Sequence, residues 1–335
     1  MTAWDIYRTL PAPTAPHRYS VALSARGFRV GRSVEGFAAI LIAVPPGSST
    51  SPRRLVNLWY APPAQLDLVG EAGARETACL AVLECRTADS SLCEYFLRVV
   101  DAVLVSGDMF CDGDEVERAL DRLVSLFRCL SKPGVRTVEG LWGELAMISW
   151  ASDPAIAVAA WHSEPRALYD FSGHTDRLEV KSTLKKVREH SFNVDQTASA
   201  DDGTTLVASL MLTAGEHGTS IFQLVETIGE RLGGASEVRS RLEAIVIETL
   251  GEGWRDAGVV RFLLEPARAS LRLYDARTIP RIRCPLPPEI KEIRYVADLS
   301  TTPSLGIDMA RRRGLVFDGM MPGDAAPASN VREAP

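Results

Sequence analysis

The hydrophobic pattern of the first 86 residues predicts β-strands. Short apolar or alternating runs, cut by Gly, Pro and Ser, fill residues 19–86: YSVALSA, FAAILIAV, RRLVNLWYA, AQLDLVG and ETACLAVLEC. The pattern then takes a helical period in SSLCEYFLRVVDAVLVS and DGDEVERALDRLVSLFRCLS, and the second run stops before Pro133. Residues 1–132 are therefore predicted to form an N-terminal α+β domain, β-rich first and then helical.

A second domain is predicted over residues 133–302. TVEGLWGELAMISWAS has apolar residues at helical spacing, and DPAIAVAAWHS begins with an Asp cap and a proline at the first helical position. Strands are expected in RALYDFS, RLEVKSTL, HSFNVDQ and TTLVASLMLT, with GHTD as a hairpin turn between the first two. SIFQLVETIGERL and ASEVRSRLEAIVIETLG are predicted helices, and RASLRLYDA and EIKEIRYVADLS are predicted strands.

The last segment, residues 303–335, is rich in small, polar and Pro residues and is predicted to be loosely ordered. No apolar run reaches the roughly 18 residues that cross a bilayer. The N-terminus lacks the basic-then-apolar layout of a signal peptide, so we expect a cytoplasmic protein with no membrane partner. The formal net charge is −6, which means that any DNA affinity must be concentrated on one face.

Candidate chemistry lies in YDFSGHTDRLEVKST, residues 169–183. Side chains alternate along a strand, so Glu179 and Lys181 would share a face, and Asp170 would reach the same place across a hairpin. Carboxylate oxygens suit Mg²⁺ or Mn²⁺, and a neighbouring ammonium can neutralise charge on a phosphate, as in metal-assisted phosphodiester hydrolysis. The alternative is a solvated Glu–Lys pair, which contributes less than ~1 kcal/mol.

Three neighbouring features add weight to the chemical interpretation. Glu144 is a carboxylate within the apolar GLWGEL, although a solvated helix face would also explain it. Gln196 follows the strand HSFNV and could place an amide near the phosphate, or be an ordinary loop residue. Downstream of Lys181 lies a basic cluster that could contact a flanking phosphate or be a solvated face: Lys185, Lys186 and Arg188.

The order of helix Glu, strand Asp, strand Glu-x-Lys and then Gln resembles the PD-(D/E)XK nuclease superfamily. In particular, it resembles the bacterial PD-(D/E)XK motif proteins associated with restriction and phage-defence genes. The residues that carry the resemblance run from about 20 to 300 and include GLWGEL, AAWHSEPRALYDFS, LEVKST, HSFNVDQ, SIFQLVETI and IPRIRCPLPPEIKEIRYVADLS. The position before Asp170 is Tyr169 rather than the proline of the motif name.

The resemblance implies a restriction-endonuclease-like, mixed β-sheet core flanked by helices. Asp170 and Glu179 would be the metal ligands for Mg²⁺, with Mn²⁺ as the alternative ion, and Lys181 the catalytic lysine. Glu144 and Gln196 would be further catalytic residues. The expected activity is Mg²⁺-dependent endonuclease cleavage of double-stranded DNA in a restriction or phage-defence system.

Other sequence features bear on DNA binding and on alternative chemistry. Arginines outnumber acids in a C-terminal stretch where Arg277, Arg281 and Arg283 are candidate DNA contacts, although a solvated sheet face would also explain them. No phosphate-binding P-loop motif and no Gly-x-Ser-x-Gly elbow occurs. The histidines are few and scattered, and His162, His190 and His217 are interpreted as surface or loop residues rather than ligands.

Two other functions remain open from the sequence. One is a non-catalytic DNA-binding or scaffolding subunit of a multi-protein defence complex. The other is a repair or recombination nuclease that recognises DNA structure. Candidate partners besides DNA are a second copy of the chain and the helicase, ATPase or methyltransferase components of a defence system.

Overall fold

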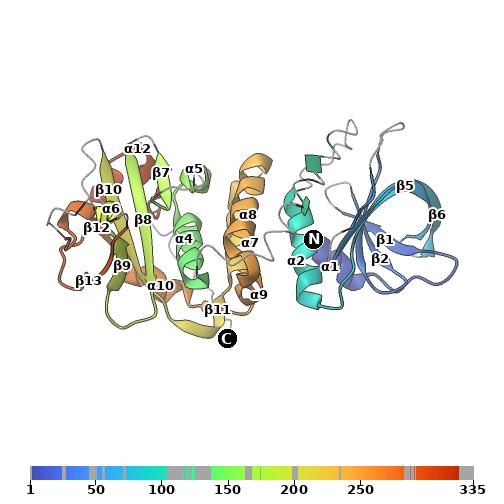
Figure 1. Ribbon diagram of the computed structural model, residues 1–335, viewed down its shortest axis with the longest axis horizontal. Coiled ribbons are helices and arrows are strands. Elements are labelled where there is room, and N and C mark those ends of the chain that lie inside the picture. The colour runs from blue at the N-terminus through green and yellow to red at the C-terminus, as the bar shows by residue number, and fades with distance from the viewer. Residues whose placement is uncertain are drawn as a thin grey trace, which may run out of the picture. The chain divides into compact units, whose positions relative to one another are not determined.

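The computed structural model describes most of the chain (Figure 1). The described residues are 2–24, 28–44, 51–54, 57–70, 73–103, 115, 118, 119, 121, 123, 124, 137–162, 168–173, 175–197, 203–233, 235–282, 287, 290 and 292–323. They form two compact units. Unit 1 comprises Met1–Pro133 and Arg239–Arg255, and unit 2 comprises Gly134–Val238 and Asp256–Pro335.

Unit 1 is built on a six-stranded sheet of order β1-β2-β3-β6-β5-β4, in which β1 also pairs with β5. Alternating apolar side chains of these strands, including Val21, Leu41 and Leu68, form one core cluster. Its elements are α1 (Ala3–Thr9), β1 (Tyr19–Leu23), β2 (Arg29–Ser33), β3 (Ala38–Ile42), β4 (Arg53–Arg54), β5 (Leu58–Val69), β6 (Arg75–Cys85) and α2 (Ser90–Val103). The second helix predicted for this region lies mostly outside the described residues.

Unit 2 contains a mixed four-stranded sheet of order β12-β10-β8-β7, flanked by helices. Strands β8 (Asp176–Thr183) and β10 (Thr204–Met211) are parallel, whereas β7 (Phe171–Gly173) and β12 (Arg272–Asp275) pair antiparallel to them. Helix α4 (Val138–Trp150) packs on β8, and α5 (Pro154–Ala160) and α7 (Ile221–Leu232) pack on α4 (Figure 1). Side-chain caps start two of these helices. Asp153, the cap predicted from the sequence, caps α5, and Ser220 forms a capping box with Gln223 at α7.

The remaining elements of unit 2 extend around this sheet. Strands β9 (Glu189–Asn193) and β13 (Arg294–Asp298) form a separate two-stranded sheet. The other elements are α6 (Val194–Thr197), β11 (Ala214–Thr219), the 3-10 helix η3 (Ala276–Thr278), α10 (Leu264–Ser270), α11 (Ile307–Arg311) and α12 (Leu315–Met320). The predicted class of a mixed sheet flanked by helices is thus present in unit 2.

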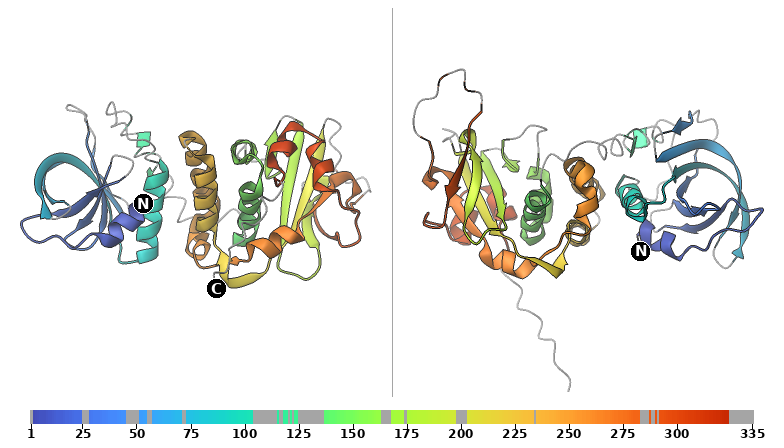
Figure 2. Two further views of the ribbon diagram at one scale, coloured as in Figure 1. Left: turned by 180° about the vertical axis from the view of Figure 1, so that it is seen from behind. Right: turned by 60° about the horizontal axis from the view of Figure 1, so that its bottom comes forward.

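The structure of residues 303–323 differs from the prediction for this segment. They were expected to be loosely ordered, but they include α11 and α12, and Phe317 and Met321 are fully buried. Helix α12 packs against α5 and β8 (Figure 2), because it carries enough apolar surface to bury despite the polar residues around it. Residues 324–335 lie outside the described part of the chain.

A second difference concerns the boundary between the units. Helix α8 (Ser236–Leu250), the 3-10 helix η2 (Gly251–Gly253) and the start of α9 (Trp254–Ala257) belong largely to unit 1, although they follow the segment Gly134–Val238 of unit 2. The Trp254 ring, for example, lies 5.2 Å from the Tyr95 ring of α2. Among the described residues, no helix has the length and apolarity to span a bilayer.

Candidate functional site

Helix α4 carries Glu144 into the interior of unit 2. Thr137 caps the helix by accepting a hydrogen bond from the Gly140 amide, and the helix is buried continuously from Leu141 to Ile148. A Cβ at Gly143 would lie 2.0 Å from the Ser182 hydroxyl oxygen on β8, so this glycine permits the close approach of helix and strand. Glu144 itself is 0% exposed, which excludes the solvated helix face as an explanation.

Two adjacent residues contact the Glu144 carboxylate. Trp161 Nε1 donates a hydrogen bond to Glu144 Oε2 at 2.8 Å, and His162 Nε2 lies 3.0 Å from the same oxygen. Trp161 ends α5 as its C-cap, and His162 follows with a φ of 42°. A left-handed conformation is uncommon for a residue with a Cβ and costs about 1 kcal/mol or more. His162 is therefore a strained residue, and it is the residue whose ring contacts Glu144.

Asp170 is placed by the β7–β8 hairpin. It immediately precedes β7, whose Phe171 pairs with Leu178 of β8. Its Oδ2 accepts a hydrogen bond of 2.7 Å from the Val180 amide, between Glu179 and Lys181. Its main-chain oxygen accepts a second hydrogen bond, of 2.9 Å, from the His162 amide. The predicted hairpin is confirmed, and it brings Asp170 beside the Glu-x-Lys strand.

Glu179, Lys181 and Gln196 form a hydrogen-bonded network. Lys181 Nζ lies 2.7 Å from Glu179 Oε1, and Gln196 Nε2 donates to that same oxygen at 2.7 Å. Gln196 Oε1 accepts from Lys181 Nζ at 3.3 Å, and Gln196 Nε2 also donates to the Leu168 carbonyl. Side-chain exposure is 3% for Glu179 and 18% for Lys181, so the pair is not a solvated surface ion pair. Gln196 is a structural link of this network rather than an ordinary loop residue.

Glu144, His162 and Asp170 each offer one ligand atom, and these atoms all lie within 4.8 Å of one another. Two buried carboxylates and an imidazole are a donor set that fits a divalent cation. The sequence paired Asp170 with Glu179 as ligands, whereas the tight cluster pairs Asp170 with Glu144 and His162. The sequence interpreted His162 as a surface or loop residue rather than a ligand. It does lie in a turn, but its ring contacts the buried Glu144 carboxylate.

The predicted DNA-contacting residues have different environments. Lys185 and Lys186 are exposed after β8, although Lys185 Nζ lies 2.7 Å from a Glu189 oxygen. DNA binding by Arg188 stays a prediction, and its guanidinium is engaged within unit 2. Its Nη1 donates to the Ser209 carbonyl and hydroxyl at 3.0 and 2.8 Å, and its Nη2 donates to the Ser270 carbonyl. Arg188 is therefore used to tie the β8–β9 connection to β10 and α10.

The C-terminal arginines are also engaged within unit 2. Arg277 donates to both carboxylate oxygens of Asp275, at 2.9 and 2.7 Å, and Arg313 pairs with the same carboxylate. The Arg277 hydrogen bonds hold the pKa of Asp275 well below its usual range. Arg281 donates to the Thr197 carbonyl at 3.0 Å. DNA binding by Arg277 and Arg281 stays a prediction, and Arg283 lies outside the described residues.

Two titratable side chains near the site have shifted pKa values. Burial raises the pKa of Tyr169, which precedes Asp170 and donates a hydrogen bond to the Asp195 carbonyl. Burial, followed by the charges of Lys181 and Arg188, lowers the pKa of His190 to about 4. His190 is thus a neutral, buried residue that contacts Ser209 at 2.8 Å, and not the surface residue that the sequence indicated.

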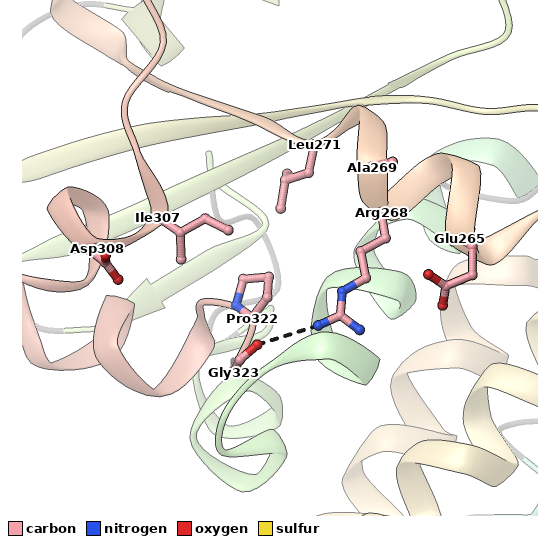
Figure 3. A pocket seen from close by; sticks show the side chains of 8 residues that line it. All are labelled: Glu265, Arg268, Ala269, Leu271, Ile307, Asp308, Pro322 and Gly323. Atoms are coloured by element: carbon pink, nitrogen blue, oxygen red, sulfur yellow. Dashed lines mark hydrogen bonds between the residues drawn. The ribbon is translucent and has the colours of Figure 1, made fainter. Parts of the chain in front are cut away.

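A cavity of about 480 Å³ lies elsewhere in unit 2, beside α10 and α11 (Figure 3). Arg268 and Leu271 line it, and Arg268 Nη2 donates to the Gly323 carbonyl at 3.4 Å. None of its lining residues belongs to the acid–lysine site, a name we use for Glu144, His162, Asp170, Glu179, Lys181 and Gln196.

A mixed sheet flanked by helices, with buried Asp170 and Glu179 and a lysine two positions beyond Glu179, defines a PD-(D/E)XK protein of the restriction-endonuclease-like class. Over residues 4–300, the sequence matches the family described as "Putative PD-(D/E)XK family member, (DUF4420)", and the chain belongs to this family. This confirms the resemblance. A search of curated proteins gives no match, and a search of solved structures gives none either.

Proposed function

We propose that this protein is a metal-dependent endonuclease that cleaves double-stranded DNA in a restriction or phage-defence system. The observation that carries the proposal is one hydrogen bond, from the Val180 amide to Asp170 Oδ2. It fastens the buried Asp170 to the backbone between Glu179 and Lys181, which supports a shared site for the acids and the lysine of the motif. Membership of a nuclease-like family supports the same conclusion.

The residues fit a divalent cation. Glu144 and Asp170 are both 0% exposed, and their ligand atoms lie within 4.8 Å of each other and of His162. Carboxylate pairs buried in this way are costly unless a positive partner compensates their charge. Glu144 and Asp170, with Glu179 on the adjoining strand, would hold Mg²⁺ or Mn²⁺. The ion, when bound, supplies positive charge that stabilises negative charge developing on a phosphodiester.

The chain's own groups perform the remaining tasks. Lys181 Nζ is held by Glu179 and Gln196, so its ammonium is positioned before the substrate arrives. A positioned cation stabilises the charge of a transition state without reorganising at the moment of reaction. Trp161 orients the Glu144 carboxylate through its indole N–H. Lys185 and Lys186, both exposed beyond β8, are the nearest candidates in sequence for contacts with flanking phosphates.

A cleavage assay on supercoiled plasmid tests the proposal. Purified protein is incubated with Mg²⁺, with Mn²⁺ and with EDTA, beside an Asp170→Asn variant of matched purity. We expect nicked or linear DNA with either ion, and none with EDTA or with the variant. If the folded wild-type protein binds DNA without cutting it under any of these conditions, the scaffolding function replaces the nuclease function.

A further inference from the structure

His162 is the residue of the acid–lysine site for which the sequence motif provides no role. Its Nε2 lies 3.0 Å from Glu144 Oε2, and its main-chain amide donates to the Asp170 carbonyl at 2.9 Å. His162 therefore contacts Glu144 through its ring and Asp170 through its backbone. The side chain is 19% exposed, so the imidazole stands at the edge of the buried cluster.

The local backbone is arranged to deliver this ring to the cluster. Trp161 pairs with Phe171 as an isolated β-bridge, which joins the end of α5 to the strand that follows Asp170. His162 then takes a φ of 42° instead of continuing an extended chain. Strained residues of this kind persist only where the surrounding structure holds them. The indole of Trp161 fixes Glu144 on one side while the next residue presents its imidazole to the same oxygen.

We propose that His162 Nε2 is a direct ligand of the cation held by Glu144 and Asp170, which makes the site a mixed nitrogen–oxygen site. The proposal rests on the metal-dependent function proposed above and adds the identity of a ligand to it. Imidazole nitrogen suits Mn²⁺ and later transition ions better than Mg²⁺, which prefers oxygen. His162 accordingly favours binding of Mn²⁺ relative to Mg²⁺.

Pulsed electron paramagnetic resonance of tag-free protein loaded with Mn²⁺ tests the ligand directly. An imidazole nitrogen bound to Mn²⁺ gives a ¹⁴N modulation, which should change to the ¹⁵N pattern in wild-type protein containing ¹⁵N-histidine. The modulation should vanish in His162→Asn, because this variant lacks the imidazole nitrogen. Asn is chosen because it tolerates the left-handed backbone of residue 162. The control is His217→Asn, which changes an exposed histidine of β11 and should leave the modulation intact.

Titration with Mn²⁺ and Mg²⁺ supplies a second readout. We expect His162→Asn to weaken Mn²⁺ binding by about tenfold or more and Mg²⁺ binding by less, with an unchanged thermal melt in the absence of metal. Asp170→Asn distinguishes the two proposals. If Asp170→Asn loses Mn²⁺ while His162→Asn keeps wild-type affinity, or wild-type protein shows no ¹⁴N modulation, His162 is not a ligand and the nuclease proposal stands. Wild-type protein that binds no Mn²⁺ overturns both.

Discussion

At the scale of single residues, Gln196 explains how the buried Glu179 and the half-buried Lys181 can form an ion pair. A buried ion pair is favourable only when its remaining polar atoms have hydrogen-bond partners. Gln196 donates to Glu179 at 2.7 Å and accepts from Lys181 at 3.3 Å, so one amide serves both members of the pair. The ammonium is therefore held in one place, which is the property required of a residue that acts on a phosphate.

We expect His190 to make the stability of unit 2 depend on pH. Its pKa is lowered to about 4 in the folded chain, mainly by burial, against about 6.5 in the unfolded chain. Between these values the unfolded chain binds a proton that the folded chain excludes, so stability falls as pH is lowered. We expect His190 to reduce the free energy of unfolding by about 2 kcal/mol between pH 7 and pH 5, measured by urea unfolding at each pH.

The matched variants are His190→Gln and His217→Gln. The first should lose this part of the pH dependence, because glutamine carries no titrating proton in this range. The second replaces an exposed histidine and should keep the wild-type slope. An unaltered slope in His190→Gln would show that His190 titrates equally in both states.

Most of the residues that the structure brings together around Glu144 and Glu179 were candidates in the sequence, but His162 was not. Glu144 could be predicted because a carboxylate between Trp142 and Leu145 is unusual in an apolar helix. The alternation of β8 placed Glu179 and Lys181 on one face, as found. His162, by contrast, meets Glu144 only because the Trp161–Phe171 bridge returns the chain beside α4. No local spacing in the sequence encodes that contact.

At the scale of elements, the site depends on the distance between α4 and β8, which Gly143 controls. Alanine favours a helix over glycine by about 1 kcal/mol. At Gly143 the added Cβ would meet Ser182 Oγ at 2.0 Å, Ser182 Cβ at 3.3 Å and Leu210 Cδ1 at 3.4 Å. We expect the steric cost of the new Cβ to exceed the gain in helix propensity. Gly143→Ala should therefore lower the free energy of unfolding by about 1–3 kcal/mol in a urea titration.

Two variants on the same elements make this test specific. Gly140→Ala changes another glycine of α4, where the nearest atom to the new Cβ is Thr137 Oγ1 at 3.4 Å, and should be neutral or stabilising. Ser182→Ala removes the closest atom and should restore much of the stability lost in Gly143→Ala. If Gly143→Ala is as stable as Gly140→Ala, α4 does not need its close approach to β8.

Elements with clear periodicity were predicted well, and those fixed by tertiary contacts were not. The helices α4, α5 and α7 and the strands β8 and β10 lie within the predicted runs. The run RASLRLYDA was expected to be a strand, but it divides into the end of α10 and β12 at Leu271. Strand β11 has the sequence AGEHGT, without apolar alternation, and pairs through isolated bridges to Phe262. Its conformation comes from that contact rather than from propensity.

At the scale of the whole molecule, unit 2 includes α12, which follows the end of the family match at residue 300. Within α12, Phe317 is fully buried whereas Leu315 is 90% exposed. Phe317→Ala should lower the free energy of unfolding by about 3–5 kcal/mol, because it leaves a large cavity. Leu315→Ala, two residues away on the same helix, should change it by less than about 0.5 kcal/mol. Equal, small effects in thermal and urea unfolding would mean that α12 does not stabilise unit 2.

The central claim is that Glu179 and Lys181 belong to a nuclease site and not to a structural ion pair. The most direct measurement is the rate of DNA cleavage by Lys181→Ala, with Lys185→Ala as the control for an exposed lysine. We expect Lys181→Ala to cut about 10²–10³-fold more slowly than the wild-type protein, since it removes one electrostatic contact of the transition state. Its melting temperature and its DNA binding in a gel shift should stay close to those of Lys185→Ala. A well-folded Lys181→Ala protein that cleaves DNA at the wild-type rate would contradict the account.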